Sequence, residues 1–200
     1  MSESAAHDGL WQVVAEHGWR GTTLARIAAS AGVGLGELRG MASAPEDLIV
    51  RFNKAVDRAV LDGTVPTEGE SPRDRLFDVL MRRLDALQPH RAGISRFMKD
   101  LPFHPLLTLR LGAGMQLSMG WMLEAAGLGS TGPAGLARIQ GLTAVWVYTL
   151  NAWMRDDSAD LSATMSALDK ALDRADQLAR SLDRSTRSNP PPVPPGETAI

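Results

Sequence analysis

The feature that most constrains this chain is an apolar seam near its C-terminal end. Residues at alternating spacings of four and three form the seam, namely Leu161, Met165, Leu168, Leu172, Ala175, Ala179 and Leu182. This periodicity predicts a helix over about residues 159–183 with one continuous stripe for a partner helix. Because one short chain has little else to cover so long a stripe, we expect a homodimer. Its interface is predicted to contain Leu161, Met165, Leu168, Leu172 and Leu182.

Helical periodicity runs through most of the remaining chain, and glycine and proline mark its interruptions. Further helices are expected over about residues 5–17, 24–31, 35–41, 45–62, 72–87, 91–100, 106–126 and 134–154. β-branched runs are short, whereas Ala, Leu, Met, Arg and Asp are abundant, so strands are not favoured. The sequence therefore predicts an all-α protein.

The stretch GTVPTEGESP, residues 63–72, is the best internal boundary because it is rich in Gly, Pro and acidic residues. We expect an N-terminal unit over residues 1–62 and a larger helical unit over residues 71–184. Residues 185–200, which include PPPVPPG, are expected to form a Pro-rich disordered tail.

Composition argues against several classes of function. The chain has no cysteine and its four histidines lie far apart, so no metal or cofactor is expected. Asp156, Asp157 and Asp160 cluster where a helix begins, a place where acids are favoured electrostatically, and no catalytic motif accompanies them. We therefore expect no enzyme activity. Without a secretory signal or an integral membrane segment, a cytoplasmic location is expected.

Two short helices joined by a glycine turn stand out in the first 60 residues. The segment Gly18-Trp19-Arg20-Gly21-Thr22-Thr23-Leu24, then Ile27-Ala28, Ala31-Gly32-Val33, Leu38 and Leu48, resembles the DNA-binding region of TetR-family regulators. The resemblance implies a TetR-like fold, in which a helix-turn-helix unit joins a larger ligand-binding and dimerisation domain. It also implies double-stranded operator DNA as a partner, contacted by Thr22, Thr23, Gly34 and Arg39.

The charge of this N-terminal unit is unusual for a DNA-binding surface. Residues 1–62 contain six Lys or Arg and eight Asp or Glu, which gives a formal charge of −2. Arg39 is the one basic side chain of residues 33–44, and Arg39 and Pro45 occupy positions where TetR-family members usually carry an aromatic residue and a Lys. Since phosphate contacts supply much of DNA affinity, any DNA binding is predicted to be weak and sensitive to salt.

A second resemblance involves the C-terminal part of the chain. Val147-Tyr148-Thr149-Leu150, then residues 156–160, Thr164 and Leu168-Asp169 are similar to the core of ubiquinone-biosynthesis lipid-binding proteins that share the TetR fold. This resemblance implies an alternative function, that of a lipid- or isoprenoid-binding accessory protein that has lost DNA binding.

A Met- and Leu-rich stretch suggests where a ligand would bind. Ordinary core packing would account for each of these residues alone, whereas together they could line a cavity for an apolar small molecule or lipid. The candidate lining residues are Phe97, Met98, Phe103, Leu111, Met115, Met119, Met122 and Tyr148. The favoured interpretation is a ligand-responsive transcriptional regulator that binds DNA as a homodimer.

Overall fold

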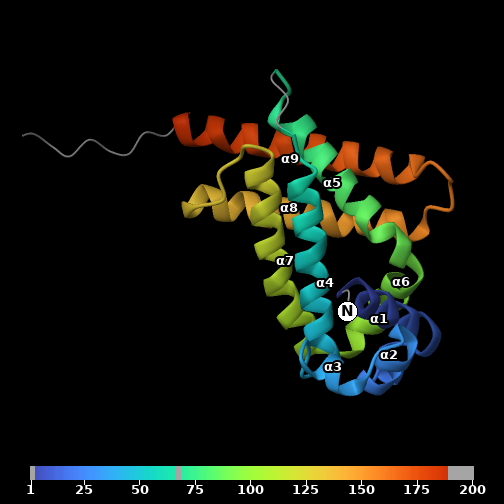
Figure 1. Cartoon of the computed structure of the whole chain (residues 1–200). Helices are drawn as coiled ribbons and strands as arrows, with labels where there is room; N and C mark the ends of the chain where they lie inside the picture. Colours follow the sequence, from blue (N-terminus) through green and yellow to red (C-terminus); the bar gives the residue numbers. More distant parts are fainter. Residues whose placement is uncertain (1–2, 66–68, 189–200) are drawn as a thin grey trace, which may run out of the picture.

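The computed structural model describes residues 3–65 and 69–188, with side chains through residue 181. Within these residues the regular structure is entirely helical, as expected (Figure 1). The helices are α1 (Glu3–His17), α2 (Leu24–Ala31), α3 (Leu35–Arg39), α4 (Pro45–Asp62), α5 (Pro72–Leu87), α6 (Arg91–Asp100), α7 (Pro105–Ala125), α8 (Gly132–Arg155) and α9 (Ser162–Ser188). Short 3-10 segments lie at Trp19–Gly21, Gln88–His90 and Leu101–Phe103.

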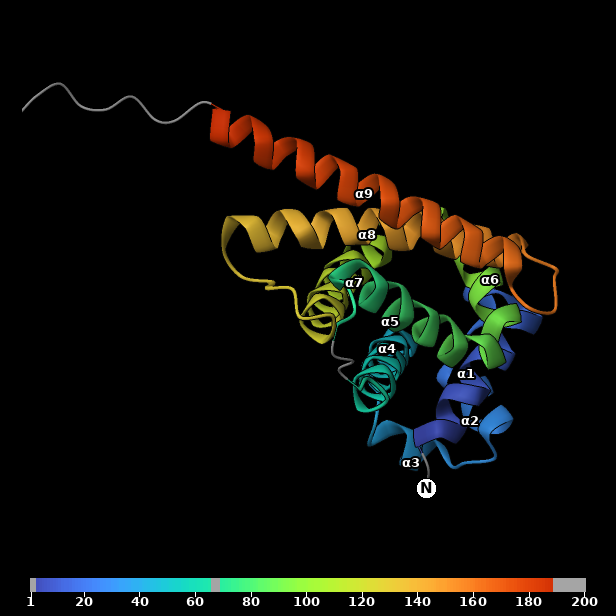
Figure 2. The ribbon, with the colours of Figure 1, turned by 90° about the horizontal axis from the view of Figure 1, so that it is seen from above.

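The helices divide between the two ends of the molecule. Helices α1, α2 and α3 gather at one end, and α8 and α9 run across the other (Figure 1). Between them, α4 and α7 pack along each other. Seen from above, α8 and α9 run in opposite directions and diverge toward the C-terminal end of α9 (Figure 2).

The α2–α3 turn follows from a few residues that the sequence already singles out. Thr23 caps α2, because its Oγ1 accepts the Arg26 N–H at 3.2 Å. Gly32 ends α2 in the left-handed region, with φ of 67°, where its lack of a Cβ removes the usual strain. The Val33 N–H then bonds the Ala28 carbonyl at 2.9 Å and completes the turn.

The last helix begins later and ends later than its periodicity predicted. Asp156 accepts hydrogen bonds from the Thr164 N–H and hydroxyl, both at 2.7 Å, so it serves as a cap for the first turn. Hydrogen bonds from Ser158 and Thr164 hold the pKa of Asp156 well below its usual range. Helix α9 therefore starts at Ser162 and continues to Ser188, through the first residues of the expected tail. Residues 189–200 and the Leu182 side chain lie outside the described part.

The first part of the α9 seam is covered from within the same chain, which removes part of our reason for assigning it to a dimer interface, whereas Ala179 further along the seam is exposed. Leu161, Leu168 and Leu172 are buried, and α9 packs against α8 and α5. Met165 is partly buried. The long helix α8 packs along α9. Its Trp146 and Trp153 are among the largest fully buried side chains, and their rings lie beside Arg83 of α5 and Arg91 of α6. The core is continuous from α1 to α9, and the division of the chain near residues 63–70 stays a prediction.

Candidate nucleic-acid interface

The helix-turn-helix unit is held together by close packing of α1 on α2. Gly9 of α1 allows this approach, because a Cβ at Gly9 would lie 2.9 Å from the Ala31 Cβ. Ile27 and Ala28 of α2 and Leu38 of α3 are buried beneath the turn. These apolar anchors leave the opposite face of α3 exposed to solvent.

The four residues proposed to contact DNA occupy different environments. Thr22 is buried and its hydroxyl donates to the Gly18 carbonyl at 2.9 Å, so its first role is structural. Thr23 is exposed and caps α2, Gly34 precedes α3 in open surroundings, and Arg39 is exposed at the end of α3. Thr23, Gly34 and Arg39 are therefore free to approach a duplex, and their contact with DNA stays a prediction.

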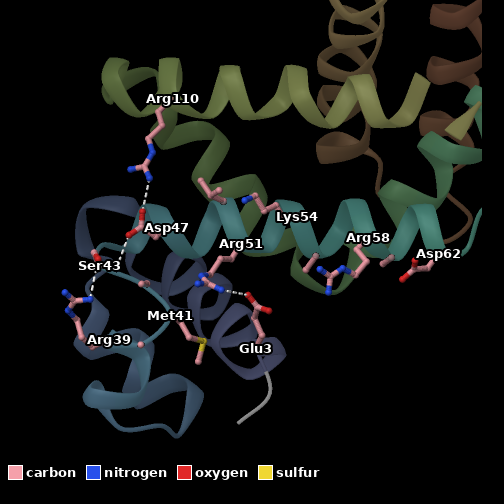
Figure 3. Close-up of a pocket in the computed structure, with 15 residues that line it drawn as sticks. Glu3, Arg39, Met41, Ser43, Asp47, Arg51, Lys54, Arg58, Asp62 and Arg110 are labelled. Atoms are coloured by element: carbon pink, nitrogen blue, oxygen red, sulfur yellow. Dashed lines mark hydrogen bonds and ion pairs between the residues drawn. The ribbon is translucent and has the colours of Figure 1, made fainter. Parts of the chain in front are cut away.

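An open groove of about 720 Å³ lies directly beside the end of α3 (Figure 3). We call it the α4 groove, because α4 forms much of its lining, with contributions from the α3–α4 connection, Glu3 and α7. Its cationic side chains are Arg39, Arg51, Lys54, Arg58 and Arg110, and its acids are Glu3, Asp47 and Asp62. Five cations against three acids give the groove a net charge of +2, in a chain whose net charge is −2.

Two ion pairs fix opposite sides of the α4 groove. Arg110 of α7 donates to Asp47 at 2.8 Å, and Arg51 donates to Glu3 at 3.2 Å (Figure 3). Asp47 also accepts the Ser43 N–H at 2.9 Å, and these bonds, with that of Arg110 first, lower the pKa of Asp47. Both pairs are solvent-accessible and contribute little to stability, but they neutralise two of the five cations.

The remaining cations of the α4 groove are available to a ligand. Within the described residues, Lys54 and Arg58 make no hydrogen bond or ion pair, and Arg39 donates to Ser43 at 3.5 Å. Sequence reasoning missed this groove. The spacing of Arg51, Lys54 and Arg58 on one helix face was a usable signal, whereas nothing local indicated that Arg110 would join them.

Helix α6 connects the helix-turn-helix unit to the rest of the chain. Asp100 of α6 accepts the Trp19 N–H at 2.8 Å, and Phe97 packs edge-on against Trp11 and Trp19. Beside this contact lies a smaller concavity of about 290 Å³ that includes Arg96 and Phe103. Helix α6 therefore packs directly on α1 and on the Trp19–Gly21 segment that follows it.

A buried ionic network lies between α4, α5, α7 and α8. Arg83 of α5 is 1% exposed and donates to Asp57 of α4, which also accepts the Ser118 hydroxyl at 2.7 Å. The Arg83 guanidinium lies 5.2 Å from the ring centroid of Trp146. Burying two charges away from water is costly, and the cost is offset only while each charge keeps its partner. Loss of one partner would therefore weaken the packing of α4 against α5 and α7.

The structure does not bring the predicted ligand-lining residues together around one chamber. Phe97 belongs to the aromatic contact between α1 and α6, while Phe103 and Tyr148 are 72% and 50% exposed. Met119 and Met122 are fully buried in the core, and Met98, Leu111 and Met115 are partly buried against it. The cause is that these residues are spread over α6, the 3-10 segment Leu101–Phe103, α7 and α8, and their side chains point to different sides of those elements.

The comparison with solved structures identifies the fold. No protein-family model matches the chain, and no curated protein matches its sequence. A solved TetR transcriptional regulator from Nitrosomonas europaea ATCC 19718 is 24% identical, covers 88% of this chain and 98% of its own, and has a TM-score of 0.69. A TetR transcriptional regulator from Rhodococcus sp. RHA1 is 18% identical, with coverages of 86% and 93% and a TM-score of 0.62.

A third solved structure extends this agreement. The fatty acid degradation regulator FadR from Bacillus halodurans is 19% identical, with coverages of 86% and 97% and a TM-score of 0.58. The chain therefore has the fold of TetR transcriptional regulators. Similarity to the ubiquinone-biosynthesis lipid-binding proteins finds no support among these structures. In the described part of the chain, no helix is long and apolar enough to span a membrane.

Proposed function

We propose that this chain is a transcriptional regulator that binds double-stranded DNA as a homodimer and changes its DNA affinity when a ligand binds. The observation that carries the proposal is the exposed face of α3 on a helix-turn-helix unit. Leu35, Gly36 and Arg39 are exposed there while Leu38 anchors the helix in the core. A second helix placed in this way suits entry into the major groove.

The same surface explains why the expected DNA affinity is low. Glu37 lies within α3 and opposes phosphate, and Arg39 is the one cation of that helix. Gly34 and Gly36 have no atoms near their missing Cβ positions, so the backbone of α3 can approach a duplex closely. Because few phosphate contacts are available, we expect sequence specificity to come from the Arg39 side chain and from the close fit of α3 to the duplex.

The dimer in this proposal uses the outer faces of α8 and α9. Leu161, Leu168 and Leu172 of the α9 seam are already buried within the chain, so exposed apolar side chains must supply the contact. Leu136, Val147 and Tyr148 of α8 and Leu178 of α9 are at least half exposed. Such exposed apolar side chains on two adjacent helices favour a self-complementary interface across a two-fold axis.

The ligand response in this proposal rests on helix contacts that link the two ends of the chain. An apolar effector contacting Met115 and its neighbours on α7 would displace α4, which packs on both α7 and α1. Such a ligand acts only by favouring one arrangement of the two helix-turn-helix units over the other. One structural neighbour regulates fatty acid degradation, and an acyl chain is a suitable first effector to test.

Selection from a random duplex library by the full chain at low and moderate salt tests DNA binding directly. We expect enrichment of a two-fold symmetric site, which Arg39→Ala binds more weakly. Fluorescence anisotropy at several salt concentrations then separates two roles for Arg39. Loss of a phosphate contact lowers the salt slope by about one unit for every duplex, whereas loss of a base contact costs about 1–3 kcal/mol at one operator position.

Lys170→Ala on the exposed face of α9 is the matched control and should leave binding unchanged. If the wild-type chain enriches no duplex at either salt concentration, the regulator proposal is wrong. Mass spectrometry of small molecules that co-purify with the chain tests the effector separately.

A further inference from the structure

The α4 groove has a charge pattern that the helix-turn-helix unit does not explain. Arg51, Lys54 and Arg58 follow one another at spacings of three and four, which places them on one face of α4. Like charges at these spacings disfavour the helix unless an anion lies between them. Glu3 neutralises Arg51, and the described residues offer no such partner to Lys54 or Arg58.

Cations from two other helices also line the α4 groove. Arg39 reaches the α4 groove from the end of α3, and Arg110 reaches it from α7 (Figure 3). Between these charges the groove is lined by small or apolar side chains, including Ala42, Ala55 and Ala59. An anion in the groove would therefore meet charged donors from α3 and α4 that are not ion-paired within the described residues, namely Arg39, Lys54 and Arg58, beside small side chains that leave it room.

The size and limits of the charged stretch indicate what kind of anion fits. Arg51 and Arg58 are separated by about 10 Å along the helix axis, from seven residues at 1.5 Å each. Asp62 stands at one end of this stretch and would repel a polyanion that continued past it, and at the other end Asp47 and Arg110 neutralise each other and add no net positive charge. A groove of about 720 Å³ also lies within the range of small-molecule sites. A compact anion with several phosphate groups matches these limits better than a long duplex backbone does.

We propose that the α4 groove binds a small phosphate-bearing molecule, such as a polyphosphate or a nucleoside polyphosphate. Lys54 and Arg58 bind the phosphate oxygens directly, since a guanidinium fork and an ammonium group are both suited to phosphate. Arg39 reaches the same ligand from α3. Binding here does not depend on whether α3 contacts DNA, so this proposal and the regulator proposal can fail separately.

Isothermal titration of the full chain with sodium tripolyphosphate at low salt tests the proposal. We expect saturable binding of one molecule per chain, with affinity falling by about tenfold or more in Lys54→Gln/Arg58→Gln, because charged hydrogen bonds are lost. The matched control is Lys170→Gln/Arg174→Gln on α9, which repeats the same Lys-to-Arg spacing on another exposed helix face and should bind like wild type. Circular dichroism of each variant shows whether the fold is kept.

Three results would overturn the proposal. These are an absence of saturable binding by the wild-type chain, an equal loss of affinity in the control, or full affinity in Lys54→Gln/Arg58→Gln. Titration with a scrambled DNA duplex at the same phosphate concentration distinguishes the source of the phosphate. If the duplex binds through Lys54 and Arg58 while tripolyphosphate and ATP do not, the groove is a DNA-backbone surface and the small-molecule assignment is wrong. A second variant, Arg58→Lys, keeps the charge and should retain more affinity than Arg58→Gln.

Discussion

Gly93 of α6 lies directly against the backbone of Trp11 in α1, where a Cβ at Gly93 would be 2.3 Å from the Trp11 carbonyl oxygen. No side chain fits at that distance, and the obstacle is backbone that cannot rotate away. This glycine therefore sets how closely α6 packs on the helix-turn-helix unit, the same contact that Asp100 and Trp19 complete with their hydrogen bond.

We predict that Gly93→Ala destabilises the chain by about 1–3 kcal/mol in urea unfolding, because the added methyl group forces α1 and α6 apart. The comparison is Gly112→Ala in α7, where nothing lies within 4 Å of the new Cβ. That change should stabilise the chain by about 0.5–1 kcal/mol, since alanine loses less conformational entropy in a helix. Equal behaviour of the two variants would contradict the close α1–α6 contact.

The Asp57–Arg83 pair gives a second prediction. Asp57→Asn leaves the Arg83 guanidinium buried without its counter-charge, and should cost about 3–5 kcal/mol of unfolding free energy. Replacing both partners, as in Asp57→Leu/Arg83→Met, removes the buried charges together and should recover most of that loss. A double-mutant cycle with Asp57→Leu and Arg83→Met as the single changes measures the coupling by denaturant unfolding, and simple additivity of these two changes would refute it.

The histidines around Phe52 predict a loss of stability in mild acid. His7 and His90 both pack edge-on against Phe52, and burial lowers the pKa of each side chain. The unfolded chain therefore takes up protons near pH 6.5 while the folded chain resists them, so stability is fully present above that pH and falls below it. Unfolding free energy should decrease between about pH 7 and pH 5, by up to about 1.4 kcal/mol per pH unit for each proton.

The variant His7→Gln/His90→Gln tests the origin of this slope and should flatten it. His17→Gln is the control, because His17 is exposed and should leave the wild-type slope unchanged. A slope that survives the double substitution would assign the pH dependence to other groups.

The dimer proposal predicts different fates for substitutions on the two sides of the α8–α9 pair. Leu136→Asp/Val147→Asp changes two exposed positions and should give a folded monomer in sedimentation. Leu168→Glu places a charge in the core and should unfold the chain, because an unpaired buried charge has no compensating contact. Leu109→Glu, on the exposed side of α7, is the control and should remain a dimer. If Leu136→Asp/Val147→Asp remains dimeric, the interface lies elsewhere.

The sequence by itself determined the helices and most of their ends. Apolar spacing, the Thr23 cap, the left-handed Gly32 and the proline positions act within a few residues of chain, so each can be read without knowing the fold. The motif around Gly18–Val33 also indicated the TetR fold, which the structural comparisons confirm. The late start of α9 lay beyond this reading, because it depends on Asp156 folding back onto Thr164.

The tertiary structure alone decided which surfaces meet. Periodicity shows that α9 has an apolar stripe, but not that α8 of the same chain covers Leu168 and Leu172. It shows that the 97–123 region is rich in methionine, but not that Phe103 in this region is exposed to solvent while Met119 is fully buried in the core. Arg83 pairs with Asp57, which lies 26 residues earlier in the chain, and Arg110 pairs with Asp47, which lies 63 residues earlier. Such pairings depend on how helices cross in space, and no local pattern of residue types encodes that geometry.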